Sequence, residues 1–344
     1  MEPGRETIAG AARERRVLVT FAADEGARAL VAETLGEVAA VTYLDDVAGA
    51  RRAAELSGAD AFLSWVVGDE LGDDDWAVLA GFPAARPLLI QTLSAGVDHV
   101  PFASLPAGVT VAGNAGGWAE PMAEHVLAMI LALAKRLLVE QGELRRGAFN
   151  QEAPTRELRG RTCAVLGLGG SGRAVLPLAK ALGMRVVALN SRGTTAEPVD
   201  FVGTLADLEH VLRAADVIVV TLPLTAATRG LIGARELGWM RPDAILVNVA
   251  RGPIVDEAAL YRHLVENPGF SAGLDVWWDE PFPDDRLRVG HPFLELPNFL
   301  GSPHNSGIVP GWFELGLGRA AENVRRYLLG EPVVGLVRRE DYAE

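Results

Sequence analysis

The sequence predicts an α/β protein with two parallel-sheet units. Two series of short apolar runs alternate with helical patterns, the first within residues 17–92 and the second from residue 161 onward. This alternation is typical of βαβ units, in which helices connect parallel strands. A glycine-rich loop follows the first strand of the second series. The length of 344 residues fits two domains, at roughly 150 residues each.

The apolar runs place the elements in order. The first series predicts strands at residues 17–21, 38–43, 61–67 and 88–92, with a helix reaching Leu35 between the first two. A long helix follows at residues 118–146, and because its middle is apolar on nearly every side, we expect it to be buried all round, between domains or subunits. The second series predicts strands at 162–166, 185–189, 217–221, 244–249, 271–275 and 299–301, and a last helix at 312–329.

Composition excludes several classes of protein. With 49% hydrophobic and 22% charged residues, the chain can form ordinary cores and is not disordered. A net charge of −13 argues against nucleic acid or anionic membrane partners. No apolar stretch approaches the roughly 20 residues of a membrane span, and the mixed-charge N-terminus predicts a frayed tail rather than a secretory signal. Cys163 is the only cysteine, which fits the cytoplasm, and its predicted strand makes it an inert core thiol.

A dinucleotide-binding loop is predicted immediately after residues 162–166. The residues form the pattern G-x-G-x-x-G between a strand and a helix: Gly167, Leu168, Gly169, Gly170, Ser171 and Gly172. In this pattern the first glycine permits a tight turn, the second admits a pyrophosphate and the third allows close packing of helix on sheet. The following helix presents free N–H groups and its positive end to the phosphates. This is the phosphate-binding loop of a Rossmann domain.

The residues after the next strand favour NADP over NAD. An NAD-selective site has an acidic residue about 20 positions on, which bonds the ribose 2′-hydroxyl. Here the residues are Asn190, Ser191 and Arg192, with no carboxylate. Ser191 and Arg192 can hold a 2′-phosphate that an acidic residue would repel. The alternative is that Arg192 is a solvated surface side chain.

Three reactive side chains follow likely strands, where open α/β sheets bind their ligands. Arg251 offers a planar cation for the carboxylate and carbonyl of a 2-oxo acid. His304 can give a proton to the developing alkoxide, and a carboxylate at Glu280 would raise the pKa of that histidine and orient it. Singly, each has a simpler interpretation as a local ion pair, a turn residue or a loop carboxylate. No histidine has a metal-ligand spacing, so no metal is predicted.

The sequence resembles the D-isomer-specific 2-hydroxyacid dehydrogenases from about residue 61 to 334. Seven pieces carry the resemblance in the family's order: SAGVDHV, AEHVLAMILALAKR, AVLGLGGSG, TLPLTAATRGLIG, VNVARGPIVDEAAL, AGLDVWWDEP and SPHNSG. The resemblance implies a flavodoxin-like substrate domain, residues 1–113 and 305–344, into which a Rossmann domain, residues 114–304, is inserted. It also implies an active site in the cleft between them, with closure about a hinge.

The resemblance implies a role for each matching residue. Arg251 would bind substrate, His304 would be the acid/base and Glu280 its partner. The backbone of Ala95, Gly96 and Val97 would cradle the substrate carboxylate. The cofactor would contact Leu222, Pro223, Val249 and Ala250, and Asp275 would meet the nicotinamide carboxamide. A homodimer is implied as well, with the helix through Glu124 and His125 at its interface.

With the charge argument at residues 190–192, the resemblance implies an NADPH-preferring reductase of small 2-oxo acids that yields D-2-hydroxy acids, with glyoxylate and hydroxypyruvate as first candidates. The sequence departs from the family at Gly170, where a larger basic residue is common, and in the PHNSG segment. Two related activities are less favoured by the sequence. Formate dehydrogenases carry glutamine in place of Glu280, and phosphite dehydrogenases carry lysine in place of Ala95, so both residues argue against these functions. The family also includes dinucleotide-sensing corepressors, which keep the same catalytic residues, so this alternative function stays open. Corepressors carry long disordered tails, however, and this chain has almost none. Four tryptophans have open roles: Trp118, Trp277, Trp278 and Trp312.

Overall fold

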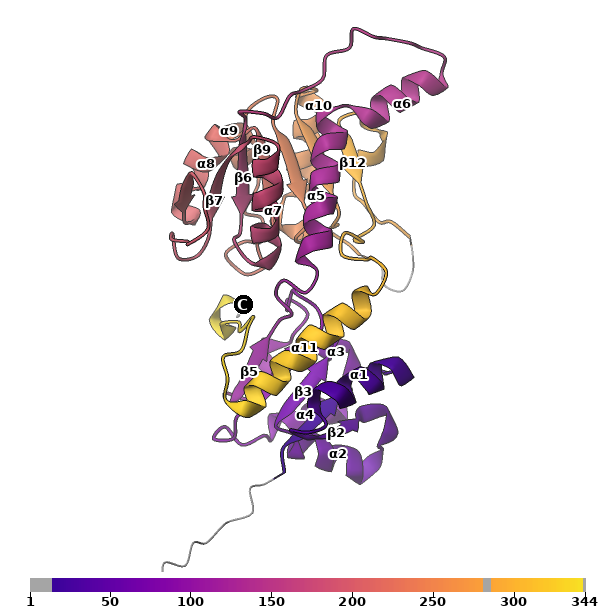
Figure 1. Cartoon of the computed structure of the whole chain (residues 1–344), viewed down its shortest axis with the longest axis vertical. Helices are drawn as coiled ribbons and strands as arrows, with labels where there is room; N and C mark the ends of the chain where they lie inside the picture. Colours follow the sequence, from indigo (N-terminus) through magenta and orange to yellow (C-terminus); the bar gives the residue numbers. More distant parts are fainter. Residues whose placement is uncertain (1–13, 281–285, 343–344) are drawn as a thin grey trace, which may run out of the picture. The chain divides into compact units, whose positions relative to one another are not determined.

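The computed structural model describes residues 14–280 and 286–342. The predicted frayed tail, at residues 1–13, lies outside this part. The chain divides into two compact units, drawn in Figure 1: unit 1 takes in the chain up to Asn114 and Gly316–Arg338, and unit 2 takes in Ala115–Leu315 and the chain from Arg339 onward. Residues 305–315 and 339–342 group with unit 2 in this division, whereas the resemblance implied that they belong to the substrate domain.

Unit 1 contains a parallel five-stranded sheet in the order β2-β1-β3-β4-β5. Its strands are β1 (Arg16–Val19), β2 (Ala40–Tyr43), β3 (Ala61–Ser64), β4 (Leu88–Thr92) and β5 (Val109–Ala112), and its helices are α1 (Glu25–Leu35), α2 (Gly49–Gly58), α3 (Val67–Glu70), α4 (Asp73–Ala80) and most of α11 (Trp312–Leu329). The order 2-1-3-4-5 is that of flavodoxin-like folds. Beyond α11 the chain pairs with the free side of β5, since Val337 donates to the carbonyl of Val111.

Unit 2 contains a parallel seven-stranded sheet in the order β12-β11-β10-β9-β6-β7-β8. Its strands are β6 (Thr162–Leu166), β7 (Arg185–Leu189), β8 (Phe201–Gly203), β9 (Val217–Val220), β10 (Ile245–Asn248), β11 (Ser271–Leu274) and β12 (Phe299–Gly301). Numbered within the unit, this is the Rossmann order 3-2-1-4-5-6 with one further strand. The predicted fold, a Rossmann domain inserted in a flavodoxin-like domain, is confirmed.

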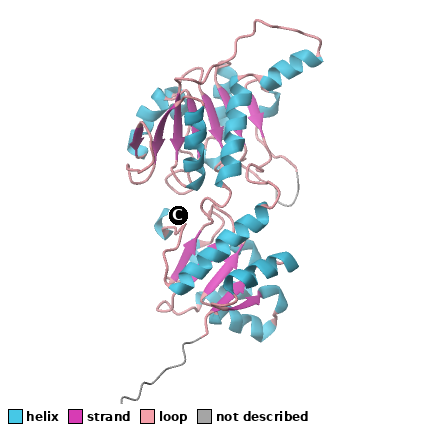
Figure 2. Ribbon diagram, viewed as in Figure 1, coloured by secondary structure: helices cyan, strands magenta, loops and turns pink. Residues whose placement is uncertain are grey.

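Helices cover both faces of the unit 2 sheet (Figure 2). The helices of this unit are α5 (Ala119–Ala134), α6 (Leu137–Arg145), α7 (Gly170–Ala181), α8 (Leu208–Ala214), α9 (Ala234–Trp239) and α10 (Glu257–Glu266). Successive residues of a strand face opposite sides. Accordingly, Cys163 and Val165 join a core with α5 and α7, whereas Ala164 and Leu166 join a core with α8, α9 and α10. Both faces of β6 are buried, as its uninterrupted apolar sequence requires.

The predicted helix at residues 118–146 is wrong as a single element. The structure has α5 and α6, separated at Lys135 and Arg136, where Arg136 adopts a left-handed φ of 53°. One face of α5 is buried and Ala128 is exposed, so one chain does not bury the helix all round. The periodicity does not reveal the break, because residues on both sides favour helix.

Two strands escaped sequence analysis, β5 and β8, and both lie at sheet edges. Both are short, with four and three residues, and neither stands out as a distinct apolar run in the sequence. Within the described residues the chain also forms short 3₁₀ turns: η1 (Leu44–Asp46), η2 (Phe102–Ser104), η3 (Leu205–Asp207), η4 (Gly252–Ile254), η5 (Phe293–Glu295) and η6 (Arg339–Asp341). In the described part of the chain, no helix combines the length and apolar character needed to cross a membrane.

Candidate active site

The glycine loop leaves β6 with a geometry that requires glycine at two positions. Gly167 has a φ of 107°, and a Cβ there would lie 2.8 Å from the carbonyl oxygen of Thr221. A Cβ on Gly172 would lie 1.9 Å from the carbonyl oxygen of Gly167. At Gly169, in contrast, a Cβ would meet no described atom within 4 Å. The loop is therefore closed on the protein side and open beside Gly169, as a pyrophosphate site needs.

Helix α7 begins at Gly170, and its first turn lies against the segment before α5. A Cβ on Gly170 would lie 2.3 Å from the Cα of Gly116, so backbone fills the space that a side chain would take. This accounts for the absence of the larger basic residue common in the family. The Ser171 hydroxyl faces the Met122 sulfur at 3.6 Å. The helix continues through Pro177 to Ala181.

The loop after β7 is organised by the side chain of Asn190. Its Oδ1 accepts the backbone N–H groups of Arg192 and Gly193, and its Nδ2 donates to the carbonyl of Thr194. The amide of Asn190 is therefore committed to the loop itself. Ser191 and Arg192 are exposed, so both lie free of the core at the carboxyl end of β7.

The remaining predicted cofactor residues follow β9 and β10. Leu222 is buried and Pro223 is exposed, with the carbonyl of Pro223 accepting the Thr228 hydroxyl at 2.6 Å. Val249 and Ala250 are buried between β10 and the next turn. All of these positions lie at the carboxyl edge of one parallel sheet, where dinucleotides bind in such folds.

Arg251 is held in place by its neighbours at the end of β10. The Asn248 side chain donates to the carbonyl of Arg251 at 2.9 Å and accepts the N–H of Ala250 at 3.0 Å. A Cβ on Gly252 would lie 2.2 Å from the carbonyl carbon of Trp277, so the Arg251 turn touches the segment that leads to Glu280. The Arg251 Nη1 donates to the carbonyl of Ala250 at 2.8 Å.

Glu280 and His304 form the predicted pair, with 2.6 Å between Oε2 and Nδ1. The other carboxylate oxygen of Glu280 accepts the N–H of Trp277 at 2.9 Å. Burial raises the pKa of Glu280, but the hydrogen bond and charge of His304, the Trp277 N–H and the charge of Arg251 together lower it below its usual value. Glu280 is thus ionised at neutral pH and can hold Nδ1–H of His304, leaving Nε2 for a substrate.

The turn that carries His304 is fixed to Asp275. His304 has a left-handed φ of 52°, which residues other than glycine rarely adopt. The Asp275 side chain is fully buried, and its oxygens accept the Ser302 hydroxyl at 2.5 Å and the N–H groups of Asn305 and Ser306 at 3.1 Å each. In this structure Asp275 therefore holds the turn, and its contact with a nicotinamide carboxamide stays a prediction.

Sequence reasoning missed Asn248, Gly252 and Ser302, which orient the reactive groups. All three stand inside the quoted segments VNVARGPIVDEAAL and SPHNSG, but the resemblance was used there only to assign roles to neighbouring residues such as Arg251 and His304. Three of the tryptophans with open roles have hydrogen-bonded indole N–H groups: that of Trp277 donates to the carbonyl of Ser302, that of Trp278 to Val255 and that of Trp118 to Trp312.

The predicted carboxylate cradle lies in unit 1, directly after β4. The Ser94 hydroxyl donates to the carbonyl of Gly96 at 2.8 Å, which bends the chain and leaves Ala95 exposed, while Val97 is buried. The predicted cradle is therefore a tight turn with Ala95 at the surface.

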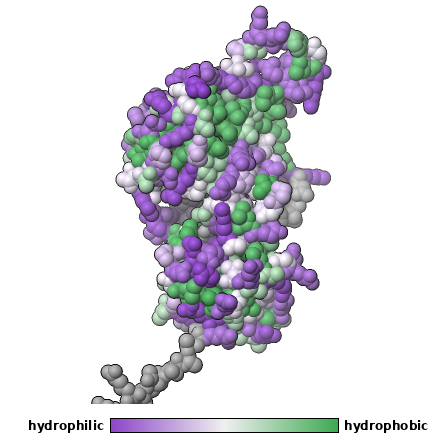
Figure 3. Space-filling view, viewed as in Figure 1, coloured by the Kyte–Doolittle hydropathy of each residue, from purple (hydrophilic) through white to green (hydrophobic). Residues whose placement is uncertain are grey.

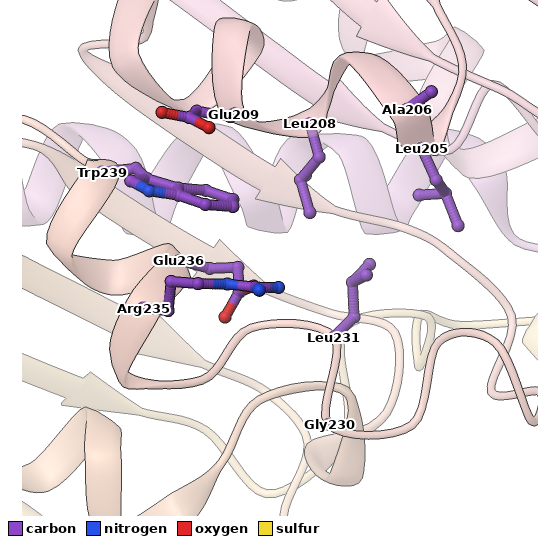
Figure 4. Close-up of a pocket in the computed structure, with 9 residues that line it drawn as sticks. All are labelled: Leu205, Ala206, Leu208, Glu209, Gly230, Leu231, Arg235, Glu236 and Trp239. Carbon is purple, nitrogen blue, oxygen red and sulfur yellow. The ribbon is translucent and has the colours of Figure 1, made fainter.

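A cavity of about 420 Å³ lies apart from these residues, between the start of α8 and helix α9. Figure 4 shows Leu208 and Leu231 directed into it and the Arg235 guanidinium near Trp239. The lining residues are Leu205, Ala206, Leu208, Glu209, Gly230, Leu231, Arg235, Glu236 and Trp239. None of them is a predicted site residue.

The cysteine and the possible metal ligands were also considered as reactive groups in the sequence. Burial raises the pKa of Cys163 to about 12, so this thiol is unreactive at neutral pH. Among the described residues, no group of three or more His, Cys, Asp or Glu side chains is arranged to hold a metal ion.

A Rossmann sheet that carries a glycine loop and an arginine, glutamate and histidine at its carboxyl edge defines a dinucleotide-dependent oxidoreductase. The family model described as "D-isomer specific 2-hydroxyacid dehydrogenase, NAD binding domain" matches residues 127–306. This chain belongs to the D-isomer specific 2-hydroxyacid dehydrogenase family.

Individual relatives agree with this assignment. The chain is 35% identical over 267 residues to the glyoxylate reductase of Aeropyrum pernix, covering 75% of this chain and 78% of that protein. A crystal structure of a putative formate dehydrogenase from Pyrobaculum aerophilum is 31% identical, with a TM-score of 0.77 over 95% of this chain and 99% of that one. A family member from Xanthobacter autotrophicus Py2, in complex with NADPH and MES, is 27% identical, with a TM-score of 0.74 over 95% and 99%.

Proposed function

We propose that this protein is an NADPH-preferring reductase that converts small 2-oxo acids, glyoxylate or hydroxypyruvate above all, to D-2-hydroxy acids. The observation that carries the proposal is the 2.6 Å pair of His304 and Glu280. This pair stands at the same sheet edge as the glycine loop and Arg251, which supports a site where an acid, an anion anchor and a dinucleotide would act together.

Each residue has a distinct task in this reaction. The glycine loop, with its open side at Gly169, would hold the dinucleotide, which when bound supplies the hydride. Arg251 would bind the substrate carboxylate and polarise its carbonyl, together with backbone N–H groups at residues 95–97. His304 would donate a proton to the carbonyl oxygen as the carbon is reduced, and the negative charge of Glu280 would stabilise the protonated imidazole. In each turnover one 2-oxo acid, one reduced cofactor and one proton would give one 2-hydroxy acid and one oxidised cofactor.

The test is loss of nicotinamide absorbance with purified protein, NADPH or NADH, and a panel of 2-oxo acids. We expect consumption of NADPH with glyoxylate or hydroxypyruvate and a D-configured product in the latter case. Turnover of formate would instead favour the function described for the Pyrobaculum aerophilum structure, although Glu280 argues against it. Tight dinucleotide binding without turnover of any acid would favour a sensor of the corepressor kind.

We expect Arg192→Asp to reverse the cofactor preference. Arg192 is exposed at the carboxyl end of β7 without an acidic residue at 190–192. An arginine–phosphate bond is worth roughly 2 kcal/mol, so kcat/KM with NADPH should fall about 30-fold or more. The value with NADH should hold or rise, because an acidic residue there bonds a ribose hydroxyl. Arg262→Asp, at an exposed position on α10, is the matched control. Equal loss with both cofactors would contradict the assignment of Arg192.

A homodimer through α5 and α6 is the proposed assembly, since apolar side chains are exposed here in one chain. Leu138 is 57% exposed and Phe149 is 75% exposed, and Figure 3 shows hydrophobic side chains gathered over α5 and further ones on α6. We expect light scattering to give a dimer for the native chain and a monomer for Leu138→Glu. Leu294→Glu, at a residue 63% exposed elsewhere in unit 2, should stay dimeric. A native monomer would contradict the proposal. The single buried thiol also fits the cytoplasm as the proposed location.

A further inference from the structure

A chain of hydrogen bonds connects helix α5 to the turn that carries His304. The Ser302 Oγ lies 2.9 Å from Nε2 of His125 and donates at 2.5 Å to Oδ1 of Asp275. His125 and Ser302 are 177 positions apart in the sequence. The Nε2 of His125 is also 3.8 Å from Oδ1 of Asp275.

The proton positions in this chain follow from the donors available. A hydroxyl has one hydrogen, and Ser302 gives it to the carboxylate of Asp275. The remaining capacity of the Ser302 oxygen is to accept, so His125 must donate from Nε2. His125 therefore carries a hydrogen on Nε2 and fixes the orientation of the Ser302 hydroxyl, which in turn occupies Oδ1 of Asp275.

The same contacts determine where His304 stands. Ser302 is held through its hydroxyl and through its carbonyl, which accepts the Trp277 indole N–H at 2.9 Å. Asp275 holds the N–H groups of Asn305 and Ser306 on the other side of His304. The left-handed conformation of His304 persists only because the surrounding contacts impose it. Loosening the bond from His125 therefore loosens one end of the turn.

We propose that His125 is a positioning residue for His304, acting through Ser302 and Asp275. The proposal rests on the proposed function in that His304 is taken as the proton donor. It adds a residue on helix α5, which belongs neither to the glycine loop nor to the three reactive side chains. His125 needs only an N–H donor at this place, so an amide side chain of similar reach should replace it in part.

The test compares His125→Leu, His125→Gln, Ser302→Ala and the double variant His125→Leu/Ser302→Ala in glyoxylate reduction. We expect kcat to fall about 10- to 100-fold in the leucine and alanine variants, because a displacement of about 1 Å can reduce rate about 100-fold. The double variant should be no slower than the slower single one, since both changes break one chain of contacts. His125→Gln should recover most of the activity, and the dissociation constant of NADPH should stay unchanged throughout.

The proposal would be overturned if the reductions in kcat of the two single variants multiplied in the double variant. It would also be overturned if kcat fell equally in His125→Gln and His125→Leu. A readout without turnover is the imidazole ¹H–¹⁵N NMR signal of His304 Nδ1–H, assigned by its absence in His304→Gln. We expect this signal to move or broaden in His125→Leu and Ser302→Ala, but not in His125→Gln. A shifted signal in a protein that reduces no acid would support the positioning and contradict the proposed function. An unshifted signal would contradict the positioning, whatever the activity.

Discussion

His304→Gln should lower kcat/KM for 2-oxo acid reduction by about 10²–10⁴-fold, the usual contribution of general acid catalysis. The physical reason is that glutamine keeps a polar side chain near Glu280 but cannot deliver a proton to the substrate oxygen. NADPH binding, measured by fluorescence titration, should stay at the native value because His304 lies outside the glycine loop. The loss should therefore appear in the chemical step.

The matched control for this variant is His210→Gln, the same substitution at an exposed histidine of unit 2 whose ring packs on Phe201. We expect it to keep native kinetics. If His304→Gln retained more than about a tenth of the native kcat/KM, a general acid other than His304 would have to be sought. Reduced NADPH affinity in the same variant would instead indicate that His304 supports the cofactor site.

Gly172→Ala should destabilise unit 2 and abolish dinucleotide binding together. Its Cβ would be built 1.9 Å from the carbonyl oxygen of Gly167 and 2.9 Å from the hydroxyl of Thr221. Overpacking typically costs about 1–3 kcal/mol, and because the obstacle is backbone we expect the upper end, about 3 kcal/mol. For a unit of this size the unfolding temperature should fall by about 10 °C in a thermal scan.

Gly169→Ala separates the two effects. Its Cβ meets no described atom within 4 Å, so the unfolding temperature should stay native. The added methyl group would stand where a pyrophosphate approaches the loop, so NADPH affinity should fall by at least about tenfold, or roughly 1.4 kcal/mol. Native affinity in Gly169→Ala would place the pyrophosphate elsewhere. Native stability in Gly172→Ala would show that the loop can rearrange.

The sequence was most informative where a run of apolar residues has sharp ends. Strands β4, β6, β7 and β12 and helix α11 have the predicted bounds. The break at Arg136 was missed, because the residues on both sides of it favour helix. The edge strand β8 was missed as well, although β12, an edge strand of the same length, was predicted.

In the candidate site, too, the sequence predicted the reactive residues but not the contacts that hold them. The motifs predicted Arg251, Glu280 and His304, and the structure places Glu280 in contact with His304. Ser302 and His125, in contrast, gain their importance from one hydrogen bond across 177 positions, which local pattern cannot reveal. The hydrogen bonds of the buried Asp275 carboxylate to the His304 turn were not foreseen either, and its contact with the cofactor, implied by the resemblance, stays a prediction.

The backbone of His304 has a bearing on how this protein can change over evolutionary time. With a φ of 52°, the position suits glycine better than any larger residue. The side chains of His304 and Glu280 are both partly exposed to solvent, so their ion pair contributes little to the free energy of unfolding. Folding alone therefore gives little reason to retain the histidine, and on the proposed function it would be selection for turnover that maintains it. A lineage released from that selection would be expected to drift to glycine or asparagine here, keeping a sound dinucleotide-binding scaffold without a reaction.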